Sequence, residues 1–386
     1  RSKNRVAQEA IPQARAEMLP RFGLRVARGK FQQRQTVRGQ KVPELLYDTE
    51  SDGIDFQQPI FRPGLIAQYV RSKHVVAGSD ADLQAARRQI AGSLSEIYMN
   101  ALLSHERIRL VGDQSARAQT ELQAAESALR AGTGTRTSID EARAEVARLL
   151  GDRIEAEQAL AYAMSALNAA SGRTVANIAP LSQARFEPEA FTPEPYELLM
   201  ERAGSSNPEL ESLRQQLAVA RAEEKMAWSA HLPTLDAVGQ WGAEQGSNPY
   251  FAENGYSAES ISLQVRMPLF SGGGDLSRDR EAAAKVSQAE DALLQAQTQL
   301  GVQIRQQSTK LISGASRIAA LKTAASAYEE SIKSTRMGVK AGTRTLLDVL
   351  NVERQAYDIQ TSLAQQQYGL LESAAPEGNA GSYPES

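Results

Sequence analysis

The residues that most often carry chemistry are few and scattered in this sequence. The chain has 386 residues, no Cys and three histidines: His74, His105 and His231. None of the histidines has a second ligand-type residue at metal-binding spacing, so each is better read as a solvated or interface residue. No Ser lies in a nucleophile elbow, and the glycine run at 272–274 is not followed by the Gly-Lys-Ser/Thr of a phosphate loop. We therefore expect no enzyme, no metal ligand set and no cofactor.

One polar motif, in contrast, occurs twice. The chain reads Gly-Thr-Arg-Thr-Ser-Ile-Asp at 134–140 and Gly-Thr-Arg-Thr-Leu-Leu-Asp at 342–348. A long proline-free segment precedes each copy and a shorter one follows, which predicts a tight turn between two antiparallel helices. The expected turn residues are Gly134, Thr135, Arg136, Thr137, Gly342, Thr343 and Thr345. Gly134 and Gly342 would end the first helix of each pair, because glycine accepts the left-handed backbone of a helix C-terminus.

The polar residues of the motif predict how the second helix of each pair begins. Thr137 and Thr345 are expected to cap it. Asp140 and Asp348 would lie in its first turn, where the helix dipole favours negative charge. For the two aspartates this is an alternative to any functional role, and it stays open at the level of sequence.

The composition excludes some classes of protein. The formal net charge is −3, which leaves no basic surface for nucleic acid, and no apolar run of about 18 residues exists for a transmembrane helix. Aromatic residues make up only 5% of the chain, which suits long helices with thin seams better than a thick globular core. The chain opens in a helical pattern at Arg1, so we expect a trimmed or processed N-terminus.

Long helices dominate the predicted fold. Apolar or small residues recur at alternating spacings of three and four between Leu293 and Val339, with Gln307 among them, and between Ile90 and Leu129. That spacing is typical of a coiled-coil seam. About 65 helical residues would form a rod of roughly 100 Å. Shorter helices are expected to return at about 137–171 and 345–373.

Four short segments alternate in polarity and predict strands. The first half has them at about 21–30 and 53–61. The second half has them from Leu235 to Trp241 and from Ser260 to Met267, with a loop expected at about 244–257. Each half thus offers one hairpin, at about 21–61 and 234–270. Each hairpin ends in a corner where strand becomes helix, marked by Pro59, Gly64, Pro268, Gly272 and Gly273.

These elements predict two structural repeats. The first spans 1–172 and the second 206–373, each with a helix, a hairpin, a long helix and a returning helix. A proline-containing linker, the equatorial region, joins them at 173–205, and a loose tail follows at 374–386. The fold class is therefore mainly α with a small β part.

The strands carry the first functional inference. Four strands with one apolar face cannot close a barrel alone, and no spare amphipathic element is left to cover that face. Several copies in a membrane could close one, because only closed barrels satisfy every backbone group there. A sheet packed on the helices of a soluble protein remains the other interpretation of the pattern.

The chain resembles the TolC-like outer membrane factors. The resemblance lies in the run Gly-Thr-Arg-Thr-Leu-Leu-Asp-Val-Leu-Asn at 342–351, the corner Pro-Leu-Phe-Ser-Gly-Gly at 268–273, the helix start Asn-Pro-Glu-Leu at 207–210 and the twofold repeat. It implies a homotrimer in the bacterial outer membrane with a 12-stranded β-barrel and a periplasmic α-helical barrel. It also implies a passive exit duct that docks with a periplasmic adaptor protein and an inner membrane transporter, for type I protein secretion or small-molecule efflux.

The resemblance further implies roles for the second turn. Asp348 matches a carboxylate that rings the periplasmic entrance and can bind cations. The second ring position is Asn351 here, so the ring should be weaker. Arg344 matches an arginine that latches the entrance closed, and Asp140 occupies the place of its partner. A tyrosine of that latch is replaced by Val339.

Two other classes remain as alternatives. A periplasmic adaptor also has coiled-coil hairpins, but it would need many more short strands. A coiled-coil scaffold outside the membrane would not need four alternating strands. The sequence does not name the cargo, although overall likeness favours protein secretion slightly over drug efflux.

Overall fold

The computed structural model describes residues 1–34, 36–37, 39–41, 44–178, 193–246 and 254–374. The chain divides into two compact units, which we treat separately: a sheet unit, Arg1–Gln84 with Asn207–Gln297, and a helical unit, Ala85–Ser206 with Thr298–Ser386. The long helices α3 (Pro63–Arg130) and α7 (Gly274–Lys340) contribute residues to both units. Their lengths confirm the long helices expected from the seam.

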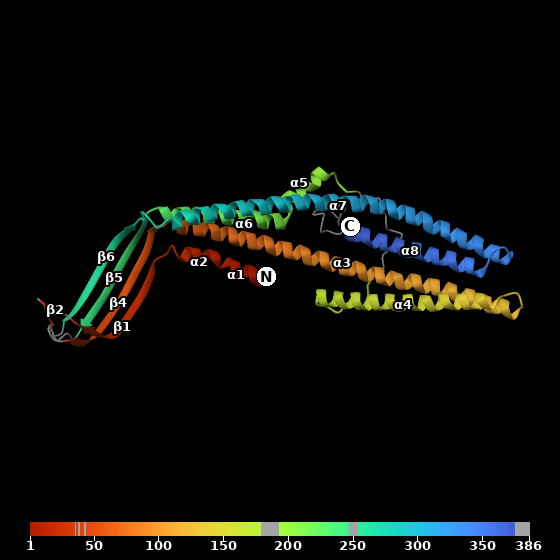
Figure 1. Cartoon of the computed structure of the whole chain (residues 1–386), viewed down its shortest axis with the longest axis horizontal. Coiled ribbons are helices and arrows are strands. Elements are labelled where there is room, and N and C mark those ends of the chain that lie inside the picture. Colours follow the sequence, from red (N-terminus) through yellow and green to blue (C-terminus); the bar gives the residue numbers. More distant parts are fainter. Residues whose placement is uncertain (35, 38, 42–43, 179–192, 247–253, 375–386) are drawn as a thin grey trace. The chain divides into compact units, whose positions relative to one another are not determined.

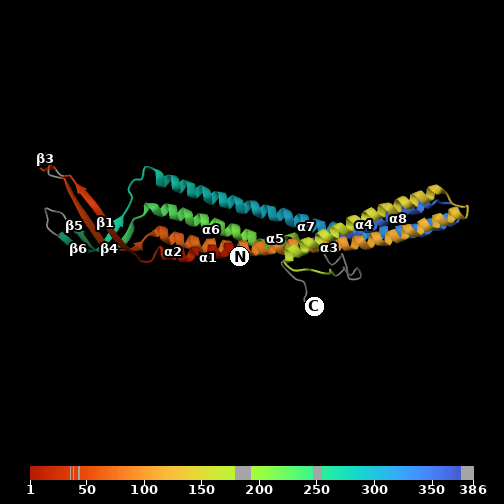
Figure 2. The same ribbon diagram turned by 90° about the horizontal axis from the view of Figure 1, so that it is seen from below.

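The sheet unit holds one four-stranded antiparallel sheet in the order β1-β4-β5-β6 (Figure 1). Its strands are β1 (Arg21–Gln33), β4 (Leu45–Phe61), β5 (Thr234–Gly246) and β6 (Asn254–Arg266). The two expected hairpins thus join into a single sheet through β4 and β5. A second, small hairpin of β2 (Thr36–Val37) and β3 (Gln40–Lys41) lies near the far ends of these strands (Figure 2). Within the described residues, β1 and β6 each pair on one side only.

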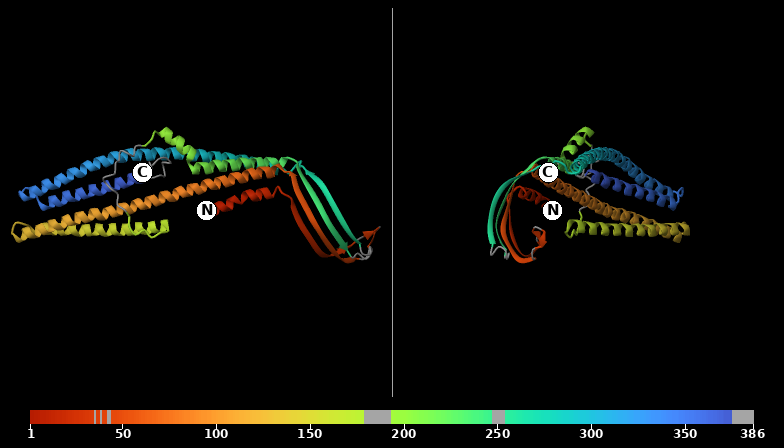
Figure 3. Two further views of the ribbon diagram at one scale, coloured as in Figure 1. Left: turned by 180° about the vertical axis from the view of Figure 1, so that it is seen from behind. Right: turned by 60° about the vertical axis from the view of Figure 1, so that its left-hand side comes forward.

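The strands extend further than the sequence predicted. β4 begins at Leu45, not near residue 53, and its residues 45–57 pair with the whole length of β1. β5 reaches Gly246 and β6 starts at Asn254, so the described residues of the loop expected at 244–257, which are 244–246 and 254–257, are strand. The added part of β4 begins with two adjacent leucines, Leu45 and Leu46, and continues with mostly polar residues, so no alternation marks it. Backbone ladder bonds extend the strands, together with side-chain contacts such as the Arg28–Asp52 pair at 2.6 Å, and the whole sheet curves (Figure 3).

The two faces of the sheet differ sharply in polarity. On one face, which we call the apolar face, large side chains are exposed: Phe22 70%, Leu24 79%, Val26 62%, Ile261 73%, Leu263 68% and Val265 71%. An aromatic cluster lies on this face, with ring centroids of Phe22 and Phe56 5.1 Å apart and those of Phe56 and Trp241 6.4 Å apart. The Trp241 ring covers Gly239, where a Cβ would come within 2.8 Å of it.

On the opposite face, which we call the polar face, Arg25 donates to both oxygens of Asp55 at 2.7 Å and Gln240 donates to Asp55 at 3.2 Å. The alternation predicted from sequence is therefore real. Nothing within the described chain covers the apolar face.

Shorter helices complete the sheet unit. The expected opening helix is present as α1 (Ser2–Gln8) and α2 (Ala10–Ala16), and the equivalent second-half helix is α6 (Pro208–Trp228), followed by the 3-10 turn η3 (Ser229–His231). Polar contacts fix them to the long helices. Asn4 donates to Asp80 at 2.7 Å, Arg71 pairs with Glu223 at 2.6 Å and Arg221 pairs with Glu290 at 2.8 Å.

The helical unit consists of two antiparallel helix pairs and one short helix. α3 turns into α4 (Arg136–Ser171), and α7 turns into α8 (Leu346–Ala374). The seam is small: Val111, Ala118 and Leu149 form one buried cluster, and Ile318 packs with Leu370 in another. Three seam positions expected from sequence are wrong, because Ile90, Leu129 and Gln307 are exposed.

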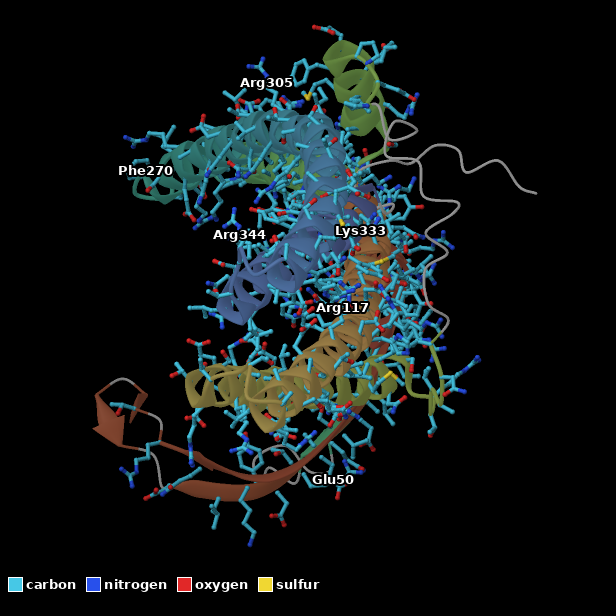
Figure 4. All side chains as sticks on the ribbon, turned by 90° about the vertical axis from the view of Figure 1, so that its right-hand side faces the viewer. Glu50, Arg117, Phe270, Arg305, Lys333 and Arg344 are labelled. Carbon is cyan, nitrogen blue, oxygen red and sulfur yellow. The ribbon has the colours of Figure 1, made fainter. Side chains whose placement is uncertain are left out.

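The linker contains α5 (Tyr196–Ser206), close to the short helix expected there. Arg305 of α7 stacks on the ring of Tyr196, 4.6 Å from its centroid (Figure 4). Gly301 makes room for α5, since a Cβ there would lie 3.0 Å from the Tyr196 hydroxyl. The part of the linker at 179–192 and most of the tail expected at 374–386 lie outside the described residues.

Both corners behave as strand-to-helix transitions, but they differ in detail. Pro59 lies inside β4, next to a register shift, and Gly64 lies in the first turn of α3 against Ser229. In the second corner Gly272 and Gly273 have left-handed backbones, with φ of 65° and 81°.

An ion pair fixes the first corner to the neighbouring strand. The Arg62 guanidinium makes two hydrogen bonds to Asp236 on β5, at 2.7 and 2.6 Å, and the Asp236 side chain is only 12% exposed. Because the pair joins α3 to the second half of the chain, it positions the sheet on its helices.

Replacing Arg62 tests this pair. Arg62→Ala leaves the Asp236 carboxylate buried without its partner, so we expect a loss of about 3 kcal/mol in the free energy of unfolding. Arg25→Ala is the matched control, because the Arg25–Asp55 pair is 57% and 39% exposed, and should cost about 0–1 kcal/mol. Denaturant or thermal unfolding in detergent measures both. Equal losses would show that the corner pair has no special role.

Candidate functional site

The two helical turns are equivalent when Gly132, rather than Gly134, is set on Gly342. The glycines with left-handed backbones are Gly132, φ 77°, and Gly342, φ 76°. The threonines that cap the following helices are Thr135 and Thr345. The pairing of Gly134 with Gly342 expected from sequence is therefore wrong by two residues, and Gly134 does not have a left-handed backbone.

The start of α4 shifts accordingly. α4 begins at Arg136 with Thr135 as its N-cap, so Thr137 is not the cap, and Arg136 and Thr137 belong to the helix. The sequence misled because Gly-Thr occurs twice in the first turn, at 132–133 and at 134–135. Matching the two turns by identical residues selects the second Gly-Thr, whereas the backbone hydrogen bonds match when the first Gly-Thr is used.

The corrected equivalence changes the comparison of acidic residues. Ser138, not Asp140, is the first-turn counterpart of Asp348: the backbone N–H of each donates to its capping threonine hydroxyl at 3.2 Å. Asp140 corresponds instead to Leu350, which is buried, whereas Asp140 is exposed, two residues after Ser138 along α4. The first turn thus has no carboxylate at the position that Asp348 occupies in the second.

A compensating pair of residues explains how the second turn accommodates a large side chain. In the first turn Gly134 packs against Ala128, and a Cβ on Gly134 would come within 3.0 Å of the Ala128 side chain. In the second turn the equivalent residues are Arg344 and Gly338, and a Cβ on Gly338 would lie 2.7 Å from the Arg344 side chain. The first turn thus has glycine at the turn position and alanine in the helix, whereas the second has glycine in the helix, which leaves room for Arg344.

Asp348 is held at the tip by its own helix start. Its Oδ2 accepts hydrogen bonds from the backbone N–H of Thr345 at 2.8 Å and from the Thr345 hydroxyl at 3.0 Å. These bonds, first the one from the backbone, lower the pKa of Asp348 below its ordinary value, with a further contribution from the Arg344 charge. The carboxylate is therefore ionised and fixed in direction. The expected capping role of Thr345 and the first-turn position of Asp348 are confirmed.

The other sequence-predicted residues lie at the same tip. Arg344 is exposed at the turn between α7 and α8 (Figure 4), and Asn351 is exposed one turn into α8. Within the described part of this chain Arg344 and Asp140 form no ion pair with each other. Their pairing between copies stays a prediction.

The sequence analysis missed a buried ionic cluster below the tip. Glu353 of α8 is fully buried and accepts from Arg336 of α7 at 2.6 Å, and Arg336 also pairs with Glu121 of α3 at 2.9 Å. Burial raises the pKa of Glu353, against the attraction of Arg336, and the nearby Glu121 charge adds to the rise. Close by, Arg117 lies 3.6 Å from Glu329 (Figure 4). This cluster joins α3 to the α7–α8 pair.

A second buried carboxylate joins the two returning helices. Glu145 of α4 accepts from Arg148 at 2.7 Å and from Arg354 of α8 at 2.6 Å. Burial by itself would raise the pKa of Glu145, but the two arginines together outweigh it, so the pKa is lowered. The two helix pairs are thus held together within the helical unit by charged contacts.

A sequence signal for these residues existed. The buried stripe of α4 contains Ile139, Ala142 and Leu149, and Glu145 falls within it at helical spacing. A carboxylate in the middle of an apolar stripe is a reason to look for a buried partner, because an unpaired buried charge is costly.

The described residues offer no alternative site of another kind. They contain no group of three or more His, Cys, Asp or Glu side chains placed to hold a metal ion. Among the helices of this part of the chain, none combines the length and apolar character that crossing a bilayer requires.

A double-mutant cycle tests the compensating pair at the second turn. Gly338→Ala should gain about 1 kcal/mol of helix propensity when Arg344 is replaced by Gly. In the presence of Arg344 this gain should vanish, because the new methyl group displaces the arginine. We expect a coupling energy of about 1–2 kcal/mol in thermal unfolding. Additive effects would mean that Gly338 does not seat Arg344.

Comparison with known proteins agrees with this geometry. The model of the family described as outer membrane efflux protein matches residues 2–173 and 199–375. The alkaline protease secretion protein AprF of Pseudomonas aeruginosa is 27% identical over 362 residues, covering 92% of this chain and 75% of the relative. The proteases secretion protein PrtF of Dickeya chrysanthemi is 28% identical over 377 residues, covering 95% and 80%.

The fold is shared with a solved outer membrane protein. VceC of Vibrio cholerae superposes with a TM-score of 0.80 at 18% identity, covering 97% of this chain and 91% of that chain. The family comprises outer membrane efflux channels rather than enzymes. The protein is accordingly placed in the outer membrane, and the chain, as a TolC-like outer membrane factor, belongs to the outer membrane efflux protein family.

Proposed function

We propose that this chain is one protomer of a homotrimeric exit duct. Three copies would contribute four strands each to a 12-stranded β-barrel, and their long helix pairs would form an α-helical barrel in the periplasm. The observation that carries this proposal is the sheet. Its apolar side chains are 62% to 79% exposed on β1 and 68% to 73% exposed on β6, and both its edge strands are open. Lipid would cover the face, and neighbouring copies would pair the edges.

We also propose that the protomer is a twofold repeat, with repeats at 1–172 and 206–373 joined by the linker at 173–205. Two observations support it. The backbone hydrogen bonds of the two turns match one for one when Gly132 is set on Gly342. The strands β1 and β5 have equal lengths of 13 residues and follow equivalent Leu-Pro steps, at 19–20 and 232–233.

For the cargo we propose a secreted protein. Two relatives, AprF and PrtF, are named for the secretion of proteases and match this chain along more than 90% of its length. The duct would then work with a periplasmic adaptor and an inner membrane transporter, as type I secretion requires. The family assignment leaves the adaptor and scaffold alternatives without support.

The tip of the helical unit is the proposed entrance. One Asp348 from each copy would form a ring of three carboxylates that attracts cations, and Asn351 would add no charge. Arg344 would latch the closed entrance against the first turn of a neighbouring copy, with Asp140 as its partner. Ser138, the structural counterpart of Asp348, lies on the same turn and leaves that position uncharged, so the ring takes its charge from the second turn.

Conductance in planar bilayers tests the ring. Asp348→Asn keeps an oxygen that can accept from Thr345, the cap of α8, but removes the charge, so cation preference should fall and block by trivalent cations should weaken. Ser138→Asp should have the opposite effect, because it adds a carboxylate at the equivalent position of the first turn. If Asp348→Asn channels keep the cation selectivity and the trivalent-cation block of the parent, Asp348 does not line the pore.

Neighbouring substitutions on β6 test the membrane position of the sheet. Leu263 lies on the apolar face and Gln264 on the polar face. Arg at 263 should cost about 2–4 kcal/mol near the bilayer midplane and reduce the yield of assembled trimer in the outer membrane. Arg at 264 should be tolerated, because that side chain would face water. Equal tolerance at the two positions would contradict the proposed barrel.

A further inference from the structure

The two open edges must meet if copies of this chain close a ring. In an antiparallel ring, β6 of one copy pairs with β1 of the next, because every other strand of the described sheet already has two partners. This junction rests on the proposed function, since it exists only between copies. Its register decides which residues of the two edges face each other and what they can bind.

The internal repeat supplies the register. The Leu-Pro dipeptides at 19–20 and 232–233 are equivalent, so Arg21, the first residue of β1, is equivalent to Thr234, the first residue of β5. Arg21 pairs with Gln57 on β4, and Thr234 pairs with Arg266 on β6. When the first hairpin is aligned with the second, Gln57 is therefore equivalent to Arg266.

The contact between the two repeats is then a template for the contact between copies. Gln57 of β4 lies opposite Val238 of β5. Gln57 corresponds to Arg266, and Val238 corresponds to Arg25, because each is the fifth residue of its strand. The junction should therefore place Arg266 of one copy directly opposite Arg25 of the next copy.

The polarity of the sheet supports this register. Phe56 lies opposite Gly239, and the same equivalences turn this pair into Val265 and Val26, two exposed side chains of the apolar face. A register shifted by one residue would place apolar side chains against polar ones. The equivalences come from the Leu-Pro steps alone, so the matched polarity is an independent check.

This register brings two cationic side chains, Arg266 of one copy and Arg25 of the next, directly opposite each other on the polar face. Arg25 is held by Asp55 at 2.7 Å, while Arg266 forms no ion pair within the described chain. Two other carboxylates of this face lie on β5: Asp236, whose charge is balanced by Arg62, and Glu244, which lies at the opposite end of the strand from Thr234, the partner of Arg266. Like charges directly opposite each other on neighbouring strands are destabilising. Each junction carries two guanidinium groups and one carboxylate, and so has an excess positive charge.

We propose that Arg266 of one copy and Arg25 of the next form an anion-binding site on the polar face of the sheet. A guanidinium offers a planar fork of N–H donors that suits carboxylate and phosphate oxygens. The site is incomplete in a single copy and occurs three times in a trimer. Its ligand class is a carboxylate or phosphate group in the water-filled interior, whether on a small ion or on cargo that passes through.

Cysteine cross-linking tests the register. The chain contains no Cys, so introduced pairs report without background. Ala27→Cys with Gln264→Cys places the two thiols at positions that the register sets opposite each other on neighbouring copies, and mild oxidation should give covalent trimers. Ala27→Cys with Ser262→Cys is the matched control, displaced by two positions along β6. Cross-linking of the control pair in preference to the first would overturn the register and the site with it.

Channel recordings with inorganic phosphate test the site itself. Arg266→Gln should weaken block of the channel by phosphate about tenfold, as expected for loss of a charge-assisted hydrogen bond. Arg28→Gln is the control, because Arg28 is an exposed arginine on β1 that pairs with an aspartate as Arg25 does, with Asp52 at 2.6 Å, but it lies on the other face of the sheet. It should leave the block unchanged.

The outcomes separate the two proposals. Channels that form normally but show the same phosphate block with Arg266→Gln as in the parent would reject the anion site and leave the duct intact. Equal weakening by Arg28→Gln would reject it too, because a general loss of charge would explain the result. If the parent protein forms no channel and no trimer, the proposed function itself fails.

Discussion

The sheet of this protein cannot bury its own apolar face, and the rest of the structure depends on that constraint. Side chains such as Leu24 and Leu263 are exposed along the edge strands, and the backbone groups of both outer edges have no partner within the described chain. Exposure of this face and of these edges to water is unfavourable. Membrane lipid would cover the apolar face, and neighbouring copies would pair with the edge strands. The corner pair Arg62–Asp236 fixes this sheet on its helices, so the sheet assembles together with the helices that carry it.

The helices of the helical unit are held together largely by charged contacts. Its seams are thin, since small residues such as Ala118 leave little apolar area to bury. Charged groups therefore join the helix pairs, with Arg336 between Glu121 and Glu353 and Arg354 bonded to Glu145. Such contacts fix geometry more than they add free energy, because burying the charges offsets much of their attraction. An interface of this kind can be rearranged with a small change in energy, which suits an entrance that opens.

The two turns show how near-copies in one chain acquire different properties. Both use the same backbone bonds and threonine caps, but a glycine lies in the turn of the first and in the helix of the second. That exchange allows Arg344 at the tip. Together with the change from Ser138 to Asp348, it concentrates ionic groups on the second turn. The proposed entrance ring therefore follows from a small number of local substitutions on a shared framework.

Periodicity and turn chemistry by themselves determined the long helices, the returning helices, the alternating strands and the tip position of Asp348, because each depends on residues close in sequence. Tertiary structure decided the rest. The pairing of β4 with β5 joins distant segments, and strand extensions such as the start of β4 at Leu45 depend on the partner strand. The first turn was misaligned because Gly-Thr occurs twice in it, and only the hydrogen bonds of Gly132 and Thr135 fix its register. The partners of Glu353 come from two other helices, so its burial depends on packing that no local pattern encodes.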